Sequence, residues 1–540
     1  MKNIVSLFVF YISIFIYLNT SLSQDGQLDP SWGGVGKIKI VIGSKEDWAN
    51  AVALQKDGKI IIVGASDNNF VVVRLNTDGS LDPTLGGSGA VTTQIGTSSS
   101  SGFSVTLQPD GKIVVAGYSF SNLGRDFTVV RYNTDGSLDN TFDSDGIVTT
   151  DIYNGGYDFA ESVALQADGK IIVAGFGSVG TDVNSYSIQA FVVVRYNVDG
   201  SLDSTFGENG KVTTRISTDS AYGCYDNAYG VAIQADGKII VAGHSYLGKI
   251  APDFSLVRYN TDGSLDNTFN GDGKVTTEIG DSEDIANSVA IQADGKIILA
   301  GYTWNESEEQ SDIAVVRYNV DGSLDNTFGN SGKVMTDISK FDHANSIVLQ
   351  ANGKIIIAGY KYSSEIINDD FLIIRYNADG SLDSTFGDDG IVTTDMQNSY
   401  DHSSSVVLKT DGRIVVAGNT RTKYSSFDNH FAVVRYMGSS GPVSVDVEDE
   451  ILTKEFVLSQ NYPNPFNPNT KINYSIPKTG FVILKIYDVL GNEITTLVNE
   501  EQSTGNYEIQ FNGSNISSGV YFYRMQIEGF TDTKKFILIR

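Results

Sequence analysis

The chain has 540 residues, a single cysteine and a formal net charge of −27 at pH 7. One cysteine cannot form an internal disulfide, so stability must come from core burial, for which a chain of this length is ample. The acidic excess disfavours binding to nucleic acid and to anionic membrane surfaces, whereas cations such as Ca²⁺ remain compatible with it.

Residues 1–23 are predicted to form a secretory signal peptide. Lys2 is followed by an apolar run over residues 4–18 and by a small-x-small sequence at residues 21–23. This is the order of a charged start, an apolar core and a cleavage site. The alternative, a membrane anchor, is disfavoured because the run is short for crossing a bilayer. We therefore expect export by the Sec route to the periplasm and no transmembrane segment in the mature chain.

Residues 24–437 contain seven copies of a repeated unit, which predicts a repeat architecture. Two sequence elements define the unit. The first is the polar turn DG-x-LD, which starts at Asp25, Asp78, Asp135, Asp199, Asp262, Asp321 and Asp379. The second is an apolar run that ends in arginine, at Arg74, Arg131, Arg195, Arg258, Arg317, Arg375 and Arg435.

Each unit is predicted to form four short β-strands. In one unit, β-branched and aromatic runs cover residues 211–216, 230–234, 238–243 and 254–259, with Gly, Asp and Asn turns between them. The run at 238–243 is almost continuously apolar, as expected for a strand covered on both faces. Four antiparallel strands with a covered third strand describe a β-propeller blade packed between its neighbours.

The polar turn is predicted to join the outermost strand of one blade to the innermost strand of the next, so that each blade is one contiguous unit. Its Asp and Asn side chains are suited to Asx turns. An arginine on the neighbouring strand is expected to pair with the last Asp of the turn, as in Arg258 and Asp266. A surface pair of this kind would contribute little to stability.

The ends of the repeat region favour a closed ring of seven blades over an open solenoid. The region begins with a turn at residues 25–37 and ends with a fourth strand at Arg435 and Tyr436, after which no further turn of this type follows. In a ring the N-terminal turn can fill that place, whereas an open array would expose two apolar faces. We expect residues 25–32 to pack beside Arg435 and Tyr436. We also expect that no polypeptide bond crosses the seam, which is the contact between the first and last blades of the ring.

The repeats resemble the bacterial delta-60 repeat, a β-propeller repeat of unknown function. The similarity is carried by RYNTDGSLDNTFNGDGKVTT at residues 258–277 and by SVAIQADGKIILAG at residues 288–301. It extends over residues 24–437. The resemblance implies a β-propeller fold and no particular activity.

A linker of small and acidic residues, 438–455, precedes a second all-β region at residues 456–540. This region has 7 basic and 7 acidic residues, whereas residues 24–437 have 29 and 53. Its short strands fit a small Ig-like β-sandwich. The expected fold class is therefore all-β: a seven-bladed β-propeller with four antiparallel strands per blade, followed by a small Ig-like β-sandwich.

The C-terminal region resembles the type A sorting domain of the type IX secretion system. The residues that carry the resemblance are Tyr462, Pro463, Asn464, Pro465, Tyr487, Asp488, Gly491, Gly519, Tyr521, Lys534 and Lys535. The resemblance implies a Gram-negative cell, recognition by the type IX translocon and delivery across the outer membrane to the cell surface or the medium. It leaves open whether the tail is removed and whether the protein is anchored or released.

No catalytic set is evident in the sequence. The four histidines lack a metal-ligand spacing such as HExxH, and the chain has no phosphate-binding loop, dinucleotide fingerprint or nucleophile elbow. The expectation is that the protein has no cofactor, with Ca²⁺ as the one alternative.

An Asp recurs just before the second strand of the units. The candidate residues for Ca²⁺ are Asp158, Asp226, Asp284, Asp342 and Asp401, and Asp47 occupies the same position. A second Asp precedes the fourth strand at Asp126, Asp253, Asp312 and Asp370. The favoured interpretation is that the first set caps turns by accepting backbone N–H hydrogen bonds. The alternative is an acidic face that binds Ca²⁺ through carboxylates and carbonyls.

The loops before the fourth strands are the most variable segments and are expected on the same face. Their candidate ligand-binding aromatic residues are Tyr186, Tyr246, Trp304, Tyr362 and Tyr424. Because variable loops on a rigid scaffold commonly carry recognition, we expect an exported, non-enzymatic propeller that binds a surface glycan or a protein. A polysaccharide-acting lyase or hydrolase and a purely structural surface component are the alternatives. An enzyme would need an asymmetric acid/base pair in the channel, whereas the repeats look symmetric.

Overall fold

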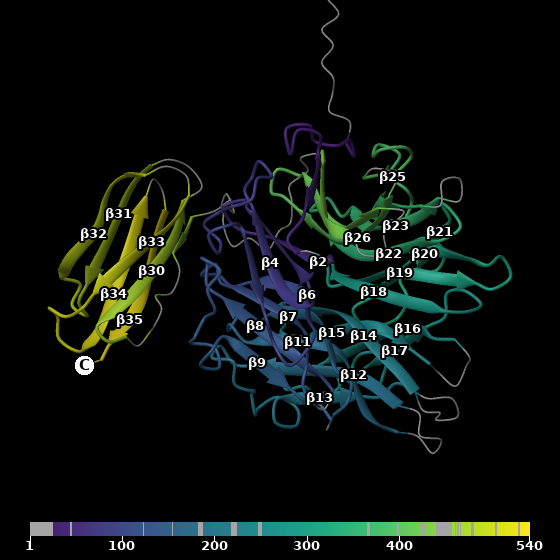
Figure 1. The fold of residues 1–540 in the computed structure, drawn as a ribbon. Helices are drawn as coiled ribbons and strands as arrows, with labels where there is room; N and C mark the ends of the chain where they lie inside the picture. The colour runs from purple at the N-terminus through teal and green to yellow at the C-terminus, as the bar shows by residue number, and fades with distance from the viewer. Residues whose placement is uncertain are drawn as a thin grey trace, which may run out of the picture. The chain divides into compact units, whose positions relative to one another are not determined.

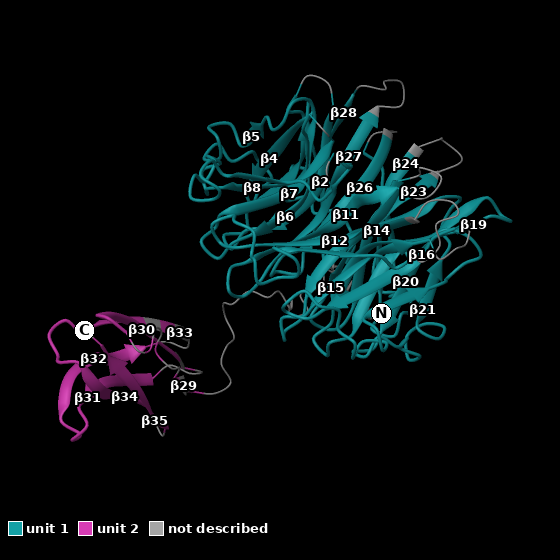
Figure 2. Ribbon diagram, turned by 90° about the horizontal axis from the view of Figure 1, so that it is seen from below, with its two compact units in different colours: residues 1–445 teal, residues 446–540 magenta. Residues whose placement is uncertain are grey.

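The protein is all-β in the part of the chain that the structure describes (Figure 1). The structure, a computed structural model, describes residues 25–539 except 44–45, 123, 154, 182–186, 218–223, 247–250, 364–367, 397–398, 423–427, 439–455, 459–460, 462–463, 465, 477–479, 503–504 and 528–529. The predicted signal peptide, residues 1–23, lies outside this range. Within it, no helix has the length and hydrophobicity needed to span a membrane. The chain divides into two compact units, Met1–Val445 and Asp446–Arg540 (Figure 2).

In the described residues, the first unit contains seven groups of four antiparallel strands, and these follow one another in chain order except that the last group takes its outermost strand from the N-terminus (Figure 1). The innermost strands contact one another from group to group. They are β2 (Asp47–Leu54), β6 (Ser100–Leu107), β10 (Phe159–Leu165), β14 (Cys224–Ile233), β18 (Asp284–Ile291), β22 (Asp342–Leu349) and β26 (Ser399–Leu408). The second strands are β3 (Ile60–Ser66), β7 (Ile113–Phe120), β11 (Ile171–Thr181), β15 (Ile239–Ser245), β19 (Ile297–Asn305), β23 (Ile355–Ser363) and β27 (Ile414–Thr422).

The third strands and the outermost strands complete the groups. The third strands are β4 (Asn69–Leu75), β8 (Arg125–Tyr132), β12 (Ser187–Tyr196), β16 (Asp253–Tyr259), β20 (Gln310–Tyr318), β24 (Asn368–Tyr376) and β28 (Asn429–Tyr436). The outermost strands are β5 (Ala90–Thr93), β9 (Ile147–Thr150), β13 (Lys211–Thr214), β17 (Lys274–Thr277), β21 (Lys333–Thr336), β25 (Ile391–Thr394) and, for the last group, β1 (Lys37–Ile40).

Buried hydrophobic clusters between successive groups hold the ring together. Seven such clusters lie in the described part of this unit, each made of residues from two neighbouring groups. One of them joins Val71 of β4 to Val433 of β28, so the first and last groups pack against each other. The second strands are covered on both faces, as the continuous apolar runs predict; β15 is buried along its whole length. The arrangement is a β-propeller, and we call each group a blade.

The predicted order of strands within a blade is wrong. The run after the polar turn is the outermost strand of the same blade, because β17 pairs with β16 in the register Phe254↔Thr277. The bridge between Tyr259 and Leu265 folds the turn back onto the third strand, and this favours a local hairpin over a crossover to the next blade. The innermost strand is therefore the second run of each unit, and a blade combines parts of two sequence units.

The N-terminal turn packs beside the last third strand, as predicted. The Asp29 N–H donates to the Arg435 carbonyl at 2.8 Å, and the Gly26 N–H donates to the Met437 carbonyl at 2.8 Å. The prediction that no polypeptide bond crosses the seam is wrong, because β1 pairs with β28 as the outer strand of the last blade. Backbone hydrogen bonds from the N-terminal segment therefore close the ring.

The repeated Arg–Asp pair is confirmed, but it is buried and not at the surface. Arg258 Nε lies 2.6 Å from Asp266 Oδ2, and the guanidinium stacks over Phe269 at 4.4 Å. Lys238, from the hairpin of the same blade, lies 3.0 Å from the same carboxylate oxygen. Arg258 Nη1 also donates to the Val320 carbonyl, in the polar turn of the next blade. This Arg–Asp clasp therefore links neighbouring blades.

The clasp explains why the polar turn recurs. The other copies are Arg74–Asp82, Arg131–Asp139, Arg195–Asp203, Arg317–Asp325, Arg375–Asp383 and Arg435–Asp29. The predicted Asx turns are also present: Asp262 Oδ1 accepts hydrogen bonds from the Ser264 N–H at 2.9 Å and from its hydroxyl at 2.6 Å. Each turn thus supplies a clasp carboxylate and a carbonyl for the neighbouring arginine.

The second unit consists of two sheets around one core. The first sheet contains β29 (Val457–Leu458), β30 (Asn469–Ile476) and β33 (Gly505–Asn512), and the second contains β32 (Glu493–Gln502), β31 (Gly480–Tyr487), β34 (Gly519–Ile527) and β35 (Phe530–Leu538). Buried residues of both sheets, among them Ile472, Tyr523 and Phe536, form a single hydrophobic cluster. The two-sheet arrangement agrees with a small sandwich, and its Ig-like character stays a prediction.

Candidate functional site

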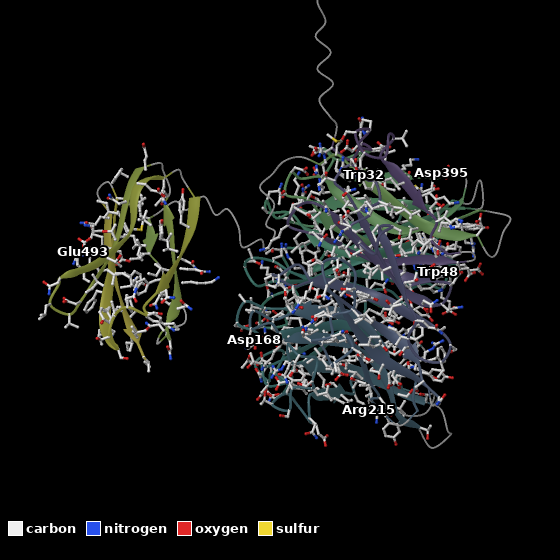
Figure 3. All side chains as sticks on the ribbon, turned by 60° about the vertical axis from the view of Figure 1, so that its left-hand side comes forward. Trp32, Trp48, Asp168, Arg215, Asp395 and Glu493 are labelled. Carbon is white, nitrogen blue, oxygen red and sulfur yellow. The ribbon has the colours of Figure 1, made fainter. Side chains whose placement is uncertain are left out.

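The two ends of the blades differ in character. At one end lie the tight hairpins between innermost and second strands. At the other, which we call the loop face, the innermost strands begin and the variable loops enter the third strands. In Figure 3, Asp168 marks a hairpin on one side of the ring, whereas Trp48, Arg215 and Asp395 lie toward the other side.

Each innermost strand carries a β-bulge. The extra residues are Asn50, Phe103, Glu161, Tyr229, Asn287, Asn345 and Ser404. The three Asn side chains donate to carbonyls of the next innermost strand: Asn50 to Gly102, Asn287 to Ala344 and Asn345 to Ser403, each at 2.8 Å. Because a bulge re-aims its extra residue, these amides tie successive innermost strands together.

Four blades lack this amide, three of them successive and the last one with Ser404 in its place, which makes the innermost strands of the ring asymmetric. Phe103, Glu161 and Tyr229 occupy the bulge in the three successive blades. Glu161 is the one carboxylate among the seven bulge residues, and burial raises its pKa to about 8. Burial and then the Glu161 charge also raise the pKa of Tyr229. The repeat pattern did not reveal this asymmetry.

Ring side chains line the loop face near the innermost strands, and we call them together the aromatic band. Their contacts form two runs, Tyr118, Phe159, Phe176, Tyr229 and His244, and then Tyr302, His343, Tyr360 and His402. Phe159 stacks on Phe176 with ring centroids 5.0 Å apart, and Tyr360 stacks on His402 at 4.1 Å. Most of these rings are half-buried, so part of each side chain is accessible to solvent while ring contacts hold its position.

This band was not predicted from the sequence, although the sequence carries a signal for it. Five members follow Ala-Gly at the end of the second-strand run, namely Tyr118, Phe176, His244, Tyr302 and Tyr360. The other members come from innermost strands of the adjacent blades. Ring contacts between the two sets depend on how the blades pack, which the repeat alone does not show.

The histidines of the band are held in defined positions. His343 lies between Tyr302, at 3.8 Å between centroids, and Tyr360, whose hydroxyl is 3.0 Å from His343 Nδ1. Burial, then the His402 charge, lowers the pKa of His343 to about 4. His402 Nε2 lies 2.6 Å from Asp369 Oδ2. His343 is therefore neutral at pH 7, and the band combines apolar faces with a few fixed polar atoms.

Three of the predicted loop aromatics lie in the described part of the chain. Tyr246 contacts His244 at 6.1 Å between centroids and so extends the band. Trp304 stacks on Phe341 at 5.8 Å, and Phe341 contacts Tyr362 at 5.5 Å, forming a separate small cluster. The remaining two candidates, Tyr186 and Tyr424, lie outside the described residues.

The recurring Asp residues cap turns, as the favoured interpretation predicts. Asp342 accepts hydrogen bonds from the N–H groups of Ile338 and Ser339, both at 2.7 Å. Equivalent bonds join Ile152 to Asp158, Ile216 to Asp226, Ile279 to Asp284 and Met396 to Asp401. Their role in holding Ca²⁺ stays a prediction.

The sorting-signal residues that the structure describes make contacts within the second unit. Asn464 Oδ1 accepts a hydrogen bond from the Ile537 N–H at 2.9 Å. Asp488 closes the β31–β32 turn by accepting from the Leu490 and Asn492 N–H groups, each at 2.8 Å, and Gly491 in that turn has a φ of 83°. The remaining described residues of the set lie on strands: Tyr487 on β31, Gly519 and Tyr521 on β34, Lys534 and Lys535 on β35. Tyr462, Pro463 and Pro465 lie outside the described residues.

Family comparisons match both units. A model for a β-propeller domain of unknown function, DUF5122, matches residues 55–85, 108–142, 166–206, 234–269, 292–328 and 350–386. A model for the secretion system C-terminal sorting domain matches residues 460–539. The protein is therefore a secreted β-propeller repeat protein. More particularly, it carries a DUF5122 repeat domain and a type IX sorting domain, which indicates export across the outer membrane to the cell surface or the medium.

Comparisons with solved structures find matches at low identity. An ulvan lyase of polysaccharide lyase family PL25 is 12% identical over 75% of this chain and 97% of that chain, with a TM-score of 0.44. An α-L-arabinofuranosidase from Fusarium graminearum is 10% identical over 62% of this chain and 92% of that chain, with a TM-score of 0.38. No curated protein matches the chain. Similarity at this level says nothing about what the chain binds or does.

Proposed function

We propose that the exported ring is a non-enzymatic binding module that holds a carbohydrate chain against the aromatic band. The observation that supports this most directly is the run of half-buried rings, held in place by packing, on the loop face. Sugar rings present C–H faces that stack on aromatic side chains, and a few placed polar groups then fix the orientation. Glu161, Asp369 and the Asn amides of the bulges are such groups.

Replacement of Tyr302 by Ala should weaken carbohydrate binding roughly tenfold, because loss of one central aromatic contact costs about 1–2 kcal/mol. The measurement is a glycan array with wild type, followed by calorimetry of both proteins with the best-bound glycan. Tyr153→Ala is the matched control, since Tyr153 is 54% exposed and outside the band. The melting temperature of each variant checks that folding is retained. Equal affinities of Tyr302→Ala and wild type would count against the band as the binding surface.

A second candidate function is a polysaccharide-acting lyase or hydrolase, and Glu161 is the observation that favours it. A carboxyl group with a pKa raised to about 8 by burial is protonated at pH 7 and can donate a proton. The glycans bound on the array can be incubated with the protein and followed for new reducing ends and for the absorbance of unsaturated products. Turnover that is lost in Glu161→Gln would establish the enzyme; binding without turnover supports the binding module.

We also propose that the chain enters the periplasm by the Sec route before the sorting domain directs it across the outer membrane. Deletion of residues 456–540 should leave a folded ring in the periplasm, because the two units have separate cores. Fractionation and surface protease accessibility of the wild-type and truncated chains measure this. Delivery of the truncated chain to the surface at the normal level would contradict the prediction.

A further inference from the structure

Three groups of carboxylates lie at junctions between blades on the loop face. In each group, oxygens of three Asp side chains lie within 4.8 Å of one another. The groups are Asp126–Asp151–Asp158, Asp312–Asp337–Asp342 and Asp370–Asp395–Asp401. One Asp comes from a third strand, one follows the outer strand of the same blade, and one lies at or next to the start of the innermost strand of the next blade.

Backbone contacts between blades bring these residues together. Ser311 on β20 bridges Phe341 in parallel, and the Ser311 N–H donates to the Lys340 carbonyl at 3.1 Å. This contact sets Asp312 beside Asp342. At the junction of the second and third blades, the Asp158 N–H donates to the Arg125 carbonyl at 2.9 Å, which sets Asp126 beside Asp158. The clustering is therefore built into the way one blade docks on the next.

Two of the groups contain buried carboxylate oxygens with no hydrogen-bond partner. Asp312 is 6% exposed and its Oδ1 has no partner, and the same holds for Oδ1 of Asp158, which is 0% exposed. A buried, unpaired carboxylate oxygen is costly because its hydration is lost without replacement. Burial, then the charges of Asp337 and Asp342, raises the pKa of Asp312 to about 6. Each of the two clusters therefore combines three carboxyl groups within 4.8 Å of one another with a buried oxygen that has no hydrogen-bond partner among the described residues.

At other junctions between blades, the Asp beside the innermost strand has a different set of neighbours. Where the last blade meets the first, His430 replaces the third-strand Asp and lies 3.4 Å from Asp47. There, Asp47 Oδ1 accepts hydrogen bonds from the Gly43 N–H at 2.9 Å and the Ser66 hydroxyl at 2.6 Å. In the third group of carboxylates, burial and then the Asp395 charge raise the pKa of Asp370 to about 6, and the Lys361 charge opposes them in part. Only the first two groups combine three acids with an unpartnered buried oxygen in the described residues.

We propose that Asp126–Asp151–Asp158 and Asp312–Asp337–Asp342 each bind one Ca²⁺ ion and thereby fasten adjacent blades. The donor set consists of carboxylate oxygens, which hard divalent cations prefer, and it contains no thiolate or imidazole of the kind that selects zinc or copper. Ca²⁺ takes six to eight oxygen ligands in flexible geometry. Asp337 is exposed, so water has access to complete the coordination. This inference uses different side chains from the carbohydrate proposal, although Asp158 and Asp342 directly precede the band residues Phe159 and His343 in the chain.

Calorimetric titration of the chelator-treated, desalted full chain with CaCl₂ tests the proposal. Wild type should bind two equivalents of Ca²⁺, and Ca²⁺ should raise its melting temperature. Asp151→Asn and Asp337→Asn should each lose one equivalent, and the double variant should lose both together with the thermal shift. Asp168→Asn, which removes an exposed carboxylate on a hairpin at the opposite end of the blades, should keep both equivalents.

The outcomes separate specific sites from general attraction of cations to an acidic protein. Absence of Ca²⁺ binding, or an unchanged stoichiometry in the double variant, would overturn the proposal. Tighter binding of Zn²⁺ than of Ca²⁺ at the same stoichiometry would overturn the choice of ion. Terbium luminescence of the same variants provides a second measurement if a melting transition is too broad to interpret. The carbohydrate assay is run separately, with and without Ca²⁺, so that failure of one proposal leaves the other standing.

Discussion

A chain that lacks residues 24–40 is expected to lose about 3–5 kcal/mol of unfolding free energy or more, and its rings are expected to associate. The deletion removes β1 and exposes the edge of β28, which is a template for pairing with another chain. It also removes Asp29, whose carboxylate lies 2.8 Å from Arg435 Nη2. Arg435 would remain largely buried without this partner, and removal of one partner of a buried ion pair is strongly destabilising.

Trp32 adds to the expected loss. Its side chain is fully buried in the cluster between the first and last blades, and Arg435 stacks over its ring at 5.2 Å. Urea unfolding and size-exclusion chromatography of the trimmed and untrimmed chains, both expressed without residues 1–23, measure the two effects. A synthetic peptide of residues 24–40 should restore the unfolding midpoint when added in excess, because it can occupy the vacant strand position. An unchanged midpoint and a monomeric trimmed ring would contradict this account of closure.

Replacement of Asp266 by Ala is expected to destabilise the ring by about 3–5 kcal/mol. The substitution leaves Arg258, which is 3% exposed, without its carboxylate partner and also removes the contact to Lys238. Asp262→Ala is the matched control, because the Asp262 side chain is exposed and accepts hydrogen bonds only from Ser264 in its own turn in the contacts described. This control should change stability by less than about 1 kcal/mol. Equal effects of the two substitutions would show that the clasp is dispensable.

The effect of Asp266→Ala should depend on pH. Burial alone would raise the pKa of Asp266, but hydrogen bonds from Thr268 and Lys238 and the charge of Arg258 outweigh it and hold the pKa below 3.8. A carboxyl with a lowered pKa in the folded state contributes its full stabilisation above the unfolded-state pKa and loses it as pH falls further. The difference in unfolding free energy between wild type and Asp266→Ala should therefore be constant near neutral pH and narrow below pH 3.8.

Much of the fold is determined by short-range sequence. Strands and turns follow from β-branched runs and from DG turns, since Gly263 has a φ of 88° that a turn requires and other residues rarely adopt. The partnership of Arg258 and Asp266 also follows, because a hairpin brings residues eight apart in sequence into contact. The sorting domain is evident from its motifs, which a family comparison matches at residues 460–539.

The order of strands within a blade required the tertiary structure. The run at 274–277 is compatible in sequence with either the outside of one blade or the centre of the next, and only the pairing of β16 with β17 decides between them. For the same reason, closure of the last blade by β1 was not foreseen, although the position of the N-terminal turn was. Register and pairing are long-range properties, which the composition of a short strand does not encode.

The candidate sites depend on tertiary packing even more than the order of strands does. The sequence by itself determined that Asp residues recur beside the innermost strands and cap turns, because that role needs only nearby N–H groups. Asp312, Asp337 and Asp342 come together only when two blades dock. The aromatic band forms only when five second strands and the neighbouring innermost strands end on the same loop face. The bulge that places Glu161 at the centre of the ring is likewise invisible in a symmetric repeat. Hydrogen bonds within a turn are determined by residues that are close in sequence. A site assembled across blades depends instead on packing between segments far apart in sequence.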